Sequence, residues 1–245
     1  MKSLEWTSDS HHILEQANGL KNYNRWLMSH FAKYFGRTIL EIGSGQGALS
    51  KLLSPKSIVI LSDVISEYLE SLKKVFTDPV INLNIEKDTP KNLLGKMDTI
   101  FSSNVFEHLK GDVSAMKNCY LLLEEGGYFL MFVPARPEIY GRLDEEMGHY
   151  RRYTKKDLRQ KAEAVGFKVE KIYYANLPGY FLWWGRGLLL GKLFKIRSGA
   201  ARSDSILAKI FDSLIVPFLY VEKYLHPPFG QSLVLIAKKS NIQAY

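Results

Sequence analysis

One ten-residue stretch decides the fold of this chain: Thr38-Ile39-Leu40-Glu41-Ile42-Gly43-Ser44-Gly45-Gln46-Gly47. Its first half is a β-type run, and its second half has glycine at every other position. Glycine permits a tight turn and lets a ligand approach the backbone without meeting a Cβ atom. Residues 48–53 then favour a helix, which Pro55 closes. Because a helix N-terminus presents free N–H groups, the stretch predicts a strand, a ligand-binding turn and a helix.

Short apolar segments recur after this turn, and helical patterns separate them. We expect strands at residues 38–42, 57–61, 79–84, 97–101, 128–133, 167–174 and 232–237. We expect helical segments at residues 12–35, 48–53, 66–76, 88–95, 113–123 and 154–165. Several strands are continuously apolar, which is typical of a sheet buried on both faces by crossover helices. The sequence therefore predicts an α/β fold with a largely parallel sheet.

The chain is expected to divide into a core and two additions. Residues 1–36 form an N-terminal helical cap, and residues 37–175 together with 231–240 form the core. Residues 176–230 interrupt the alternation of strands and helices, and they predict a helical insertion before the last strand. Pro217 should kink or end one helix of this insertion. We expect the insertion to serve as a lid, a dimer contact or an element at a membrane surface.

Acidic residues flank the glycine turn. Glu41 can pair with an ammonium group, and Asp63 ends the second strand, where a carboxylate can accept hydrogen bonds from both ribose hydroxyls. S-adenosylmethionine would place its amino acid portion on such a turn, and a dinucleotide would place its pyrophosphate there. These residues leave both ligands open. The lack of a Tyr-x-x-x-Lys pair placed for hydride chemistry counts against an NAD(P)-dependent oxidoreductase.

Three segments resemble the class I S-adenosylmethionine-dependent methyltransferases. Residues 38–47 look like their first motif, and Ser102-Ser103-Asn104-Val105-Phe106-Glu107-His108-Leu109 resembles the segment after their fourth strand. Leu123-Glu124-Glu125-Gly126-Gly127-Tyr128 resembles the turn before their fifth strand. The resemblance covers nearly the whole chain. It implies a Rossmann-like sheet of seven strands with the last one antiparallel, S-adenosylmethionine as cofactor, and methyl transfer to a small acceptor.

The resemblance also implies which residues bind the cofactor. The set comprises Tyr23, Glu41, Gly43, Ser44, Gly45, Gly47, Asp63, Val64, Asn84, Ile85, Ser103 and Asn104. Asn84 and Ile85 should flank the adenine, while Ser103 and Asn104 should line the methionine side. Position 84 is often aspartate in this family. Asn84 can still accept a hydrogen bond from the adenine amino group through its amide oxygen.

A narrower resemblance concerns the acceptor. Four segments are similar to bacterial and archaeal methyltransferases often found beside polyprenyl-sugar glycosyltransferases. They are Asn22-Tyr23-Asn24-Arg25-Trp26, Val133-Pro134-Ala135, Gly148-His149-Tyr150-Arg151-Arg152-Tyr153 and Pro227-Pro228-Phe229-Gly230-Gln231-Ser232-Leu233. The family does not fix the acceptor. We expect a small or lipid-linked molecule, with the oxygen of a sugar or isoprenoid as the methylated atom.

Two histidines are candidate catalytic residues, because an oxygen acceptor can need a general base. His149 lies in a polar loop at the carboxyl end of a strand, where open α/β sheets bind ligands. Histidine titrates near neutral pH, which suits a base. The alternative is that His149 bonds only the loop backbone. His108 begins a helix beside the cofactor strand, and a structural hydrogen bond is the better explanation for it.

Charged and aromatic residues are candidates for substrate binding. Arg151 and Arg152 can hold an anionic group such as a phosphate, or they pair with the acidic residues 144–146. Tyr180, Trp183 and Trp184 can cover the acceptor or rest on a membrane surface. Packing in a core or dimer explains such aromatic residues equally well.

Composition narrows the function classes. The net charge of +8 permits nucleic acid, an anionic membrane surface or an anionic substrate as a partner, but the basic residues are spread along the chain. We therefore expect no nucleic acid partner, and we expect no metal site. Cys119 is the single cysteine, and its apolar surroundings predict a core residue.

The N-terminal residues lack the apolar stretch of a signal peptide, so a cytoplasmic protein is expected, with peripheral contact at the inner membrane surface and a homodimer left open. A non-catalytic scaffold of a membrane glycosylation complex is the alternative from a different class.

Overall fold

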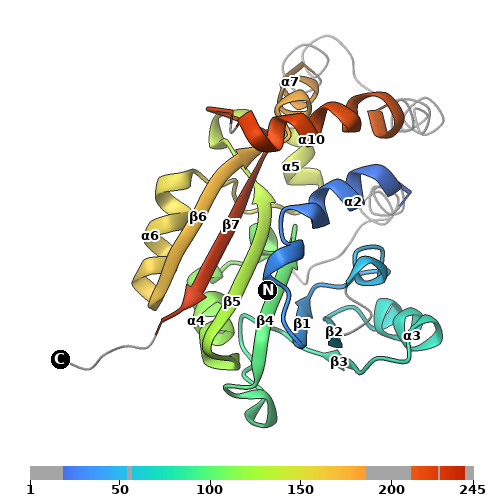
Figure 1. Cartoon of the computed structure of the whole chain (residues 1–245), viewed down its shortest axis with the longest axis vertical. Coiled ribbons are helices and arrows are strands. Elements are labelled where there is room, and N and C mark those ends of the chain that lie inside the picture. Colours follow the sequence, from blue (N-terminus) through green and yellow to red (C-terminus); the bar gives the residue numbers. More distant parts are fainter. Residues whose placement is uncertain (1–18, 54–56, 186–210, 226, 241–245) are drawn as a thin grey trace.

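A seven-stranded sheet forms the centre of the molecule in this computed structural model, which describes residues 19–53, 57–185, 211–225 and 227–240 (Figure 1). The strands are β1 (Thr38–Ile42), β2 (Ile58–Asp63), β3 (Val80–Asn82), β4 (Met97–Ser103), β5 (Leu123–Pro134), β6 (Phe167–Ala175) and β7 (Ser232–Lys239). Their order across the sheet is β3-β2-β1-β4-β5-β7-β6.

The first five strands pair in parallel, and β7 runs antiparallel to both of its neighbours, β5 and β6. Ile39 faces Val59 on β2 and Thr99 on β4, so β1 lies inside the sheet, next to the point where the strand order reverses. The structure therefore confirms the predicted α/β fold, the largely parallel sheet and the antiparallel last strand.

Helices cover both faces of this sheet, because alternate residues of the central strands point to opposite sides. Phe129, Met131 and Val133 of β5 belong to one hydrophobic cluster, whereas Leu130 and Phe132 belong to the other. The first cluster includes residues of α4 (Asp112–Leu122) and α6 (Lys155–Val165). The second includes residues of α2 (Lys21–Ser29), α3 (Ser66–Val75) and α10 (Val216–Leu225). Cys119 is fully buried in the first cluster, as predicted.

The prediction of a helix directly after the glycine turn is wrong. Residues 48–53 contain a single 3₁₀ turn, Ser50–Leu52, in place of an α-helix. Gly43, Gly45 and Gly47 all have positive φ, so left-handed residues stand at three alternate positions of the turn and a regular α-helix cannot begin there. The segment 88–95 likewise contains only the 3₁₀ turn Lys91–Leu93.

Other elements depart from the expectation at their ends. The third strand is shorter than predicted and the fifth is longer. The short helix α5 (Arg142–Glu146) lies in a segment that was expected to be a loop. The expected helix 12–35 is described only from Gly19, as α2 and the 3₁₀ turn Ala32–Tyr34, so its beginning lies outside the described residues.

The insertion is helical where the structure describes it. It contains α7 (Leu177–Gly185), a π-helical turn (Phe211–Ile215) and α10, and residues 186–210 lie outside the description. Pro217 does not end the helix, which continues to Leu225, but the helical geometry changes from π to α at Val216, directly before the proline. The α-helix begins at Val216, so Pro217 lies in its first turn, where a missing N–H is tolerated. Within the described part of the chain, no helix has the length and apolar character needed to cross a membrane.

Candidate functional site

A cavity of about 220 Å³ opens at the carboxyl ends of β1, β2 and β4. Open α/β sheets bind ligands at this edge, beside the point where the strand order reverses. Helix α2 supplies a further wall through Tyr23, Asn24 and Leu27. All but one of the predicted cofactor residues line the cavity: Tyr23, Glu41, Gly43, Ser44, Gly45, Asp63, Val64, Asn84, Ile85, Ser103 and Asn104.

The glycine turn brings bare backbone to this cavity. Gly43 has a φ of 72°, and a Cβ there would lie 2.4 Å from a methyl carbon of Val105. Gly45 has a φ of 53°, but a Cβ there would meet nothing within 4 Å. Gly43 is therefore required by both conformation and space, whereas Gly45 is required by conformation alone.

Gly47 is the predicted cofactor residue that the structure does not bring to the cavity wall. Its φ is 79°, and a Cβ would lie 2.5 Å from the ring of Phe76 and 3.0 Å from Leu72. Gly47 therefore lets the turn pack against helix α3 and the residue that follows it. A glycine in this pattern serves either ligand approach or packing, and the sequence does not separate the two; the position of Gly47 favours packing.

Asp63 closes the glycine turn from the neighbouring strand. Its Oδ2 accepts a hydrogen bond from the N–H of Gly45 at 2.8 Å. Its Oδ1 accepts from the N–H groups of Val64 at 2.8 Å and Ile65 at 3.0 Å. Burial raises the pKa of Asp63, although these three N–H groups act to lower it. The carboxylate thus joins the ends of β1 and β2 into one rim of the cavity.

Glu41 is a second buried carboxyl group on the same wall, with 3% of its surface exposed. Burial raises its pKa to about 7, and the proximity of Asp63 adds to this, while hydrogen bonds from Ser50 and Ser44 act in the opposite direction. The hydroxyl of Ser50 donates to Oε2 at 2.5 Å. Two buried carboxyl groups with raised pKa values make this wall suited to a ligand that carries positive charge.

The predicted adenine and methionine residues also lie on the cavity. The amide oxygen of Asn84 already accepts the N–H of Glu86 at 3.1 Å, so the expected bond to an adenine amino group would use its remaining lone pair. Asn104 has a φ of 52°, and its N–H donates to the carbonyl of Phe132 at 2.8 Å. Ser103 accepts from the amide nitrogen of Asn104 at 3.3 Å.

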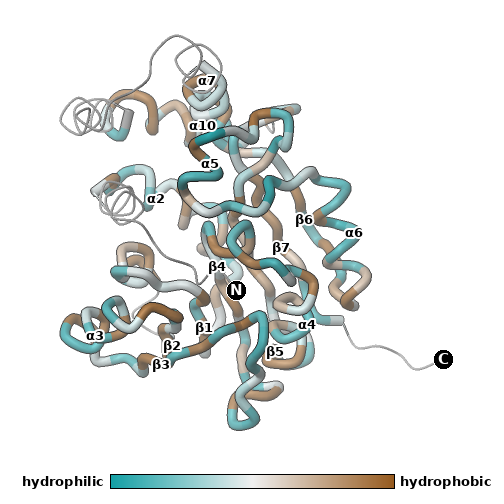
Figure 2. Tube along the Cα trace, turned by 180° about the vertical axis from the view of Figure 1, so that it is seen from behind, coloured by the Kyte–Doolittle hydropathy of each residue, from teal (hydrophilic) through white to brown (hydrophobic). Residues whose placement is uncertain are grey.

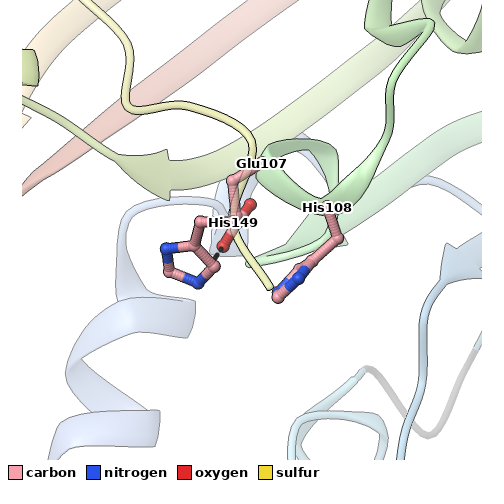
Figure 3. Close-up of side chains that lie close together, drawn as sticks. All are labelled: Glu107, His108 and His149. Atoms are coloured by element: carbon pink, nitrogen blue, oxygen red, sulfur yellow. Dashed lines mark ion pairs between the residues drawn. The ribbon is translucent and has the colours of Figure 1, made fainter. Parts of the chain in front are cut away.

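The two candidate catalytic histidines lie together, but only His108 lines the cavity. Their rings are 4.7 Å apart and nearly perpendicular (Figure 3). Burial lowers the pKa of His108 to about 3, and the neighbouring His149 adds to this, so its imidazole is neutral but a weak base. His149 is buried behind it and is absent from the cavity wall. The position of His149 therefore does not favour its expected role as a base.

Two buried acidic side chains lie on either side of His149. Its Nδ1 lies 2.8 Å from Oδ1 of Asp144. The side chain of His149 is therefore hydrogen-bonded to a carboxylate, and not to the loop backbone, which the sequence offered as the alternative. Its Nε2 lies 4.0 Å from Oε1 of Glu107, the separation marked by the dashed line in Figure 3. Glu107 is fully buried, and burial raises the pKa of its carboxyl group to about 8.

The predicted substrate role of Arg151 and Arg152 is not supported by their positions. Arg152 is buried, with Nε 2.8 Å from Oδ1 of Asp144, which is the ion pair that the sequence offered as the alternative. Arg151 pairs with Asp112 at 2.8 Å, not with an acid of its own loop. Neither arginine lines the cavity.

The predicted aromatic residues lie on α7, outside the cavity wall. The ring of Trp183 stacks against the guanidinium of Arg152, with 4.6 Å between the ring centre and the central carbon. Tyr180 contacts Phe181 and Phe229 edge to face. Trp184 is 44% exposed.

Sequence reasoning missed part of the cavity wall. Leu27 lies one helical turn after Tyr23, so the helical period combined with the choice of Tyr23 would have found it. Val105 and Leu109 flank the predicted His108 in the same motif. Tyr68 of α3 is also in the wall, and its sequence context carried no signal for that role.

Comparison with known proteins agrees with this geometry. A family model described as a methyltransferase domain matches residues 4–172, which is more than half of the chain. No curated protein matches the sequence.

Several solved structures share the fold. A putative methyltransferase of Haloferax volcanii, in complex with the Trm112 methyltransferase activator, has a TM-score of 0.66 at 14% identity, covering 98% of this chain and 100% of that one. A putative sarcosine dimethylglycine methyltransferase of Galdieria sulphuraria has a TM-score of 0.62 at 12% identity, covering 89% and 86%. Phosphoethanolamine N-methyltransferase 2 of Haemonchus contortus, in complex with S-adenosyl-L-methionine, has a TM-score of 0.61 at 16% identity, covering 90% and 53%.

The family match separates the two ligand classes that the glycine turn alone left open. It favours a methyl donor over a nicotinamide dinucleotide, and the buried carboxyl groups of Glu41 and Asp63 on the cavity wall are compatible with a positively charged donor. The chain therefore belongs to the methyltransferase domain family, and it is an S-adenosylmethionine-dependent methyltransferase.

Proposed function

We propose that this methyltransferase transfers a methyl group to an oxygen atom of a lipid-linked acceptor, such as a polyprenyl-linked sugar or an isoprenoid, while resting on a membrane surface. The observation that carries the proposal is an exposed apolar surface on the two helices of the insertion. We define the insertion face by its exposed apolar residues: Phe181, Leu182 and Trp184 of α7, Leu214 of the π-helical turn, and Phe218, Val221, Tyr224 and Leu225 of α10.

The cofactor end of the proposed reaction rests on Glu41 and Asp63. S-adenosylmethionine carries a positive sulfonium, whose methyl group it supplies to an acceptor, and a positive ammonium. A buried carboxyl group with a pKa near 7 gains a counter-charge when an ammonium lies beside it. Gly43 leaves the backbone open at the same wall. These residues hold and orient the donor, and orientation supplies much of the rate in such a displacement.

The acceptor end of the proposal rests on α10, which is apolar on two sides. Val216 and Leu219 are fully buried against the core, and the indole N–H of Trp26 donates to the carbonyl of Leu219 at 3.0 Å. On the other side, Phe218 is 70% exposed and Leu225 is 74% exposed. A helix covered by the core on one side needs no apolar residues on the other, unless they meet a further surface.

The helix that carries most of the insertion face, α10, contacts α2 on its buried side. Figure 2 shows hydrophobic colour along α10 and in part of α7, and Figure 1 shows α10 above α2. Helix α2 contributes Tyr23 and Leu27 to the cavity wall. An acceptor that is anchored in a membrane under the insertion would therefore meet the cavity from its α2 side.

The narrower resemblance in the sequence also supports a lipid-linked acceptor. Three of its four segments meet in space: Ala135 forms a β-bridge with Tyr153, and the N–H of Ala135 donates to the carbonyl of Gln231 at 2.7 Å. Most of the similarity to methyltransferases found beside polyprenyl-sugar glycosyltransferases thus concerns one connected region, at the end of β5. A homodimer that covers the insertion face is the competing use of the same surface.

A labelling experiment tests the proposal. The protein is incubated with S-adenosylmethionine that carries a labelled methyl group, together with a membrane-lipid extract or a water-soluble metabolite extract. We expect label in an organic-phase product whose methyl group is bonded to oxygen. Label confined to water-soluble products would overturn the lipid-linked acceptor. The absence of label from both extracts, despite measured cofactor binding, would favour the non-catalytic scaffold.

A further inference from the structure

Three side chains that are not part of the rim formed by the glycine turn and Asp63 lie close together, and all three are residue types that bind metal ions. Glu107, His108 and His149 each offer one ligand atom, and these atoms all lie within 4.8 Å of one another (Figure 3). A carboxylate and two imidazoles are donors that divalent transition metals accept readily. We propose that this cluster binds one divalent transition-metal ion, of the type of Mn²⁺, Fe²⁺ or Zn²⁺. The expectation from sequence was that no metal site exists.

Glu107 gives the first argument. Its side chain is fully buried, and neither carboxylate oxygen has a hydrogen-bond partner within the described parts of the chain. A buried carboxyl group without a partner is costly, and coordination of a cation is one of the few ways to offset that cost. Its backbone is fixed, because its carbonyl accepts the N–H of Tyr150 at 2.7 Å. That bond also sets His149 opposite Glu107.

The space between Glu107 and His149 gives the second argument. Oε1 and Nε2 lie 4.0 Å apart, which is too far for a hydrogen bond whichever atom carries a proton. Nε2 of His149 also lacks a hydrogen-bond partner among the residues that the structure describes. A metal ion with bonds of about 2.0–2.2 Å to nitrogen and oxygen spans two opposed donors that are about 4 Å apart. The gap therefore has the width of an ion and not that of a direct contact.

The residues behind His149 give the third argument. Its Nδ1 lies 2.8 Å from Oδ1 of Asp144, which directs the lone pair of Nε2 toward Glu107. Metal-binding histidines usually donate their second ring N–H to such a carboxylate. Asp144 is itself fully buried and accepts from Arg152 Nε at 2.8 Å and from the Gly141 N–H at 3.0 Å. The imidazole is therefore held in one orientation before any ion arrives.

His108 connects the cluster to the cofactor cavity, since it is the member that lines the cavity wall. Three protein ligands leave coordination positions open for small ligands. If the proposed function holds, an acceptor hydroxyl can occupy one of them, and a bound cation would lower the pKa of that hydroxyl. This consequence rests on the proposed function, but the metal site itself does not.

Direct metal binding tests the proposal without reference to activity. The chelator-treated protein is titrated with Co²⁺, followed by visible absorption, and with Mn²⁺, followed by electron paramagnetic resonance. We expect one equivalent of ion to bind to the wild type. Glu107→Gln and His149→Gln should each weaken binding roughly tenfold or more. His30→Gln is the matched control, because His30 is also buried, with Nδ1 2.9 Å from the hydroxyl of Tyr173, and it lies outside the cluster.

A measurement on the unaltered protein guards against variants that fail to fold. Pulsed paramagnetic resonance of the Mn²⁺-loaded wild type should detect coupling to imidazole nitrogens. Failure to bind either ion, binding that Glu107→Gln and His149→Gln leave unchanged, or a bound ion without nitrogen coupling would each overturn the site. Binding of S-adenosylhomocysteine to the chelator-treated protein is measured in parallel, so a failed metal site remains distinguishable from a failed cofactor site.

Discussion

Asp212 of the insertion accepts a hydrogen bond from the backbone N–H of Tyr23 at 2.8 Å, although 189 residues separate the two in sequence. Its other carboxylate oxygen accepts from the N–H of Asn22 at 3.2 Å. Helix α2 has no side-chain cap of its own, so this carboxylate satisfies the free N–H groups of its first turn. At the other end, the ammonium of Lys223 donates to the carbonyl of Ser29 at 2.6 Å. The insertion thus places a negative charge at the start of α2 and a positive one at its end, as the helix dipole favours.

Asp212→Ala should therefore affect both stability and cofactor binding. Loss of a capping carboxylate lowers the free energy of unfolding by about 1 kcal/mol. Because Tyr23 lies on the cavity wall, affinity for S-adenosylhomocysteine should fall by a factor of about 2 to 10. Urea unfolding and calorimetric titration measure the two effects.

Thr154→Ala is the matched control for this prediction. The hydroxyl of Thr154 accepts the N–H of Asp157 at 3.1 Å and caps α6, on the opposite face of the sheet. The Thr154→Ala substitution should lower the free energy of unfolding by a similar amount but leave the affinity for S-adenosylhomocysteine unchanged. Equal affinity losses in both variants would show that Asp212 acts only through global stability.

Gly43→Ala should abolish measurable cofactor binding, and Gly45→Ala should weaken it less. Both substitutions force a residue with a Cβ into the left-handed region, which costs about 1–2 kcal/mol. Only at position 43 does the Cβ also collide with Val105. Calorimetric titration with S-adenosylhomocysteine ranks the variants.

The double variant Gly43→Ala/Val105→Ala separates space from conformation. It should recover part of the lost affinity, because the smaller side chain removes the contact at 2.4 Å while the strain in φ remains. No recovery would mean that the backbone conformation alone decides binding at Gly43.

Much of the fold could be predicted because its signals are local. Continuous apolar runs identified the buried strands, and Thr154 with Gly166 marked the two ends of α6. The position of β7 between β5 and β6 could not be predicted, because no local sequence signal encodes it. The antiparallel direction of β7 was predicted only from the family resemblance. The prediction of a helix after the turn was wrong, because helical spacing does not reveal the positive φ of the three alternating glycines.

The cofactor rim was predictable for a similar reason, since Glu41, Gly43 and Asp63 follow directly from strand ends. Residues that depend on distant contacts were not. The sequence left Arg152 as either a ligand for an anionic group or the partner of an acidic residue, and only the folded structure shows that Asp144 and Trp183 contact it. The sequence did not indicate a role for Glu107 beside His108. Its burial depends on a distant contact, since the loop at Tyr150 packs against it and the Tyr150 N–H donates to its carbonyl.

Phe218→Glu should reduce binding to vesicles if the insertion face rests on membranes. Phe218 is 70% exposed on α10, and a carboxylate there removes apolar area and repels anionic lipid. Sedimentation with vesicles rich in phosphatidylglycerol should show several-fold less bound protein. Val75→Glu on α3 is the control, because Val75 is 60% exposed and receives the same charge.

The outcome also distinguishes a membrane from a dimer. A different outcome is that the wild type fails to bind vesicles and sediments as a dimer. If the Phe218→Glu substitution dissociates that dimer, the insertion face is a contact between two copies of the chain. Loss of vesicle binding in both glutamate variants would indicate a general charge effect and would contradict a specific role for α10.

Affinity for S-adenosylhomocysteine should rise between pH 6 and pH 8. Burial raises the pKa of Glu41 to about 7 in the free protein, so the carboxyl group is mostly protonated at pH 6. The ligand ammonium favours the ionised form and lowers that pKa in the complex. Binding below pH 7 must therefore release a proton, and the association constant should fall by up to about tenfold per pH unit there. Calorimetric titration in buffers of different ionisation enthalpy counts this proton directly. Glu41→Gln should bind more weakly at pH 8 and lose the dependence, and a variant that kept the wild-type slope would assign the titration to another group.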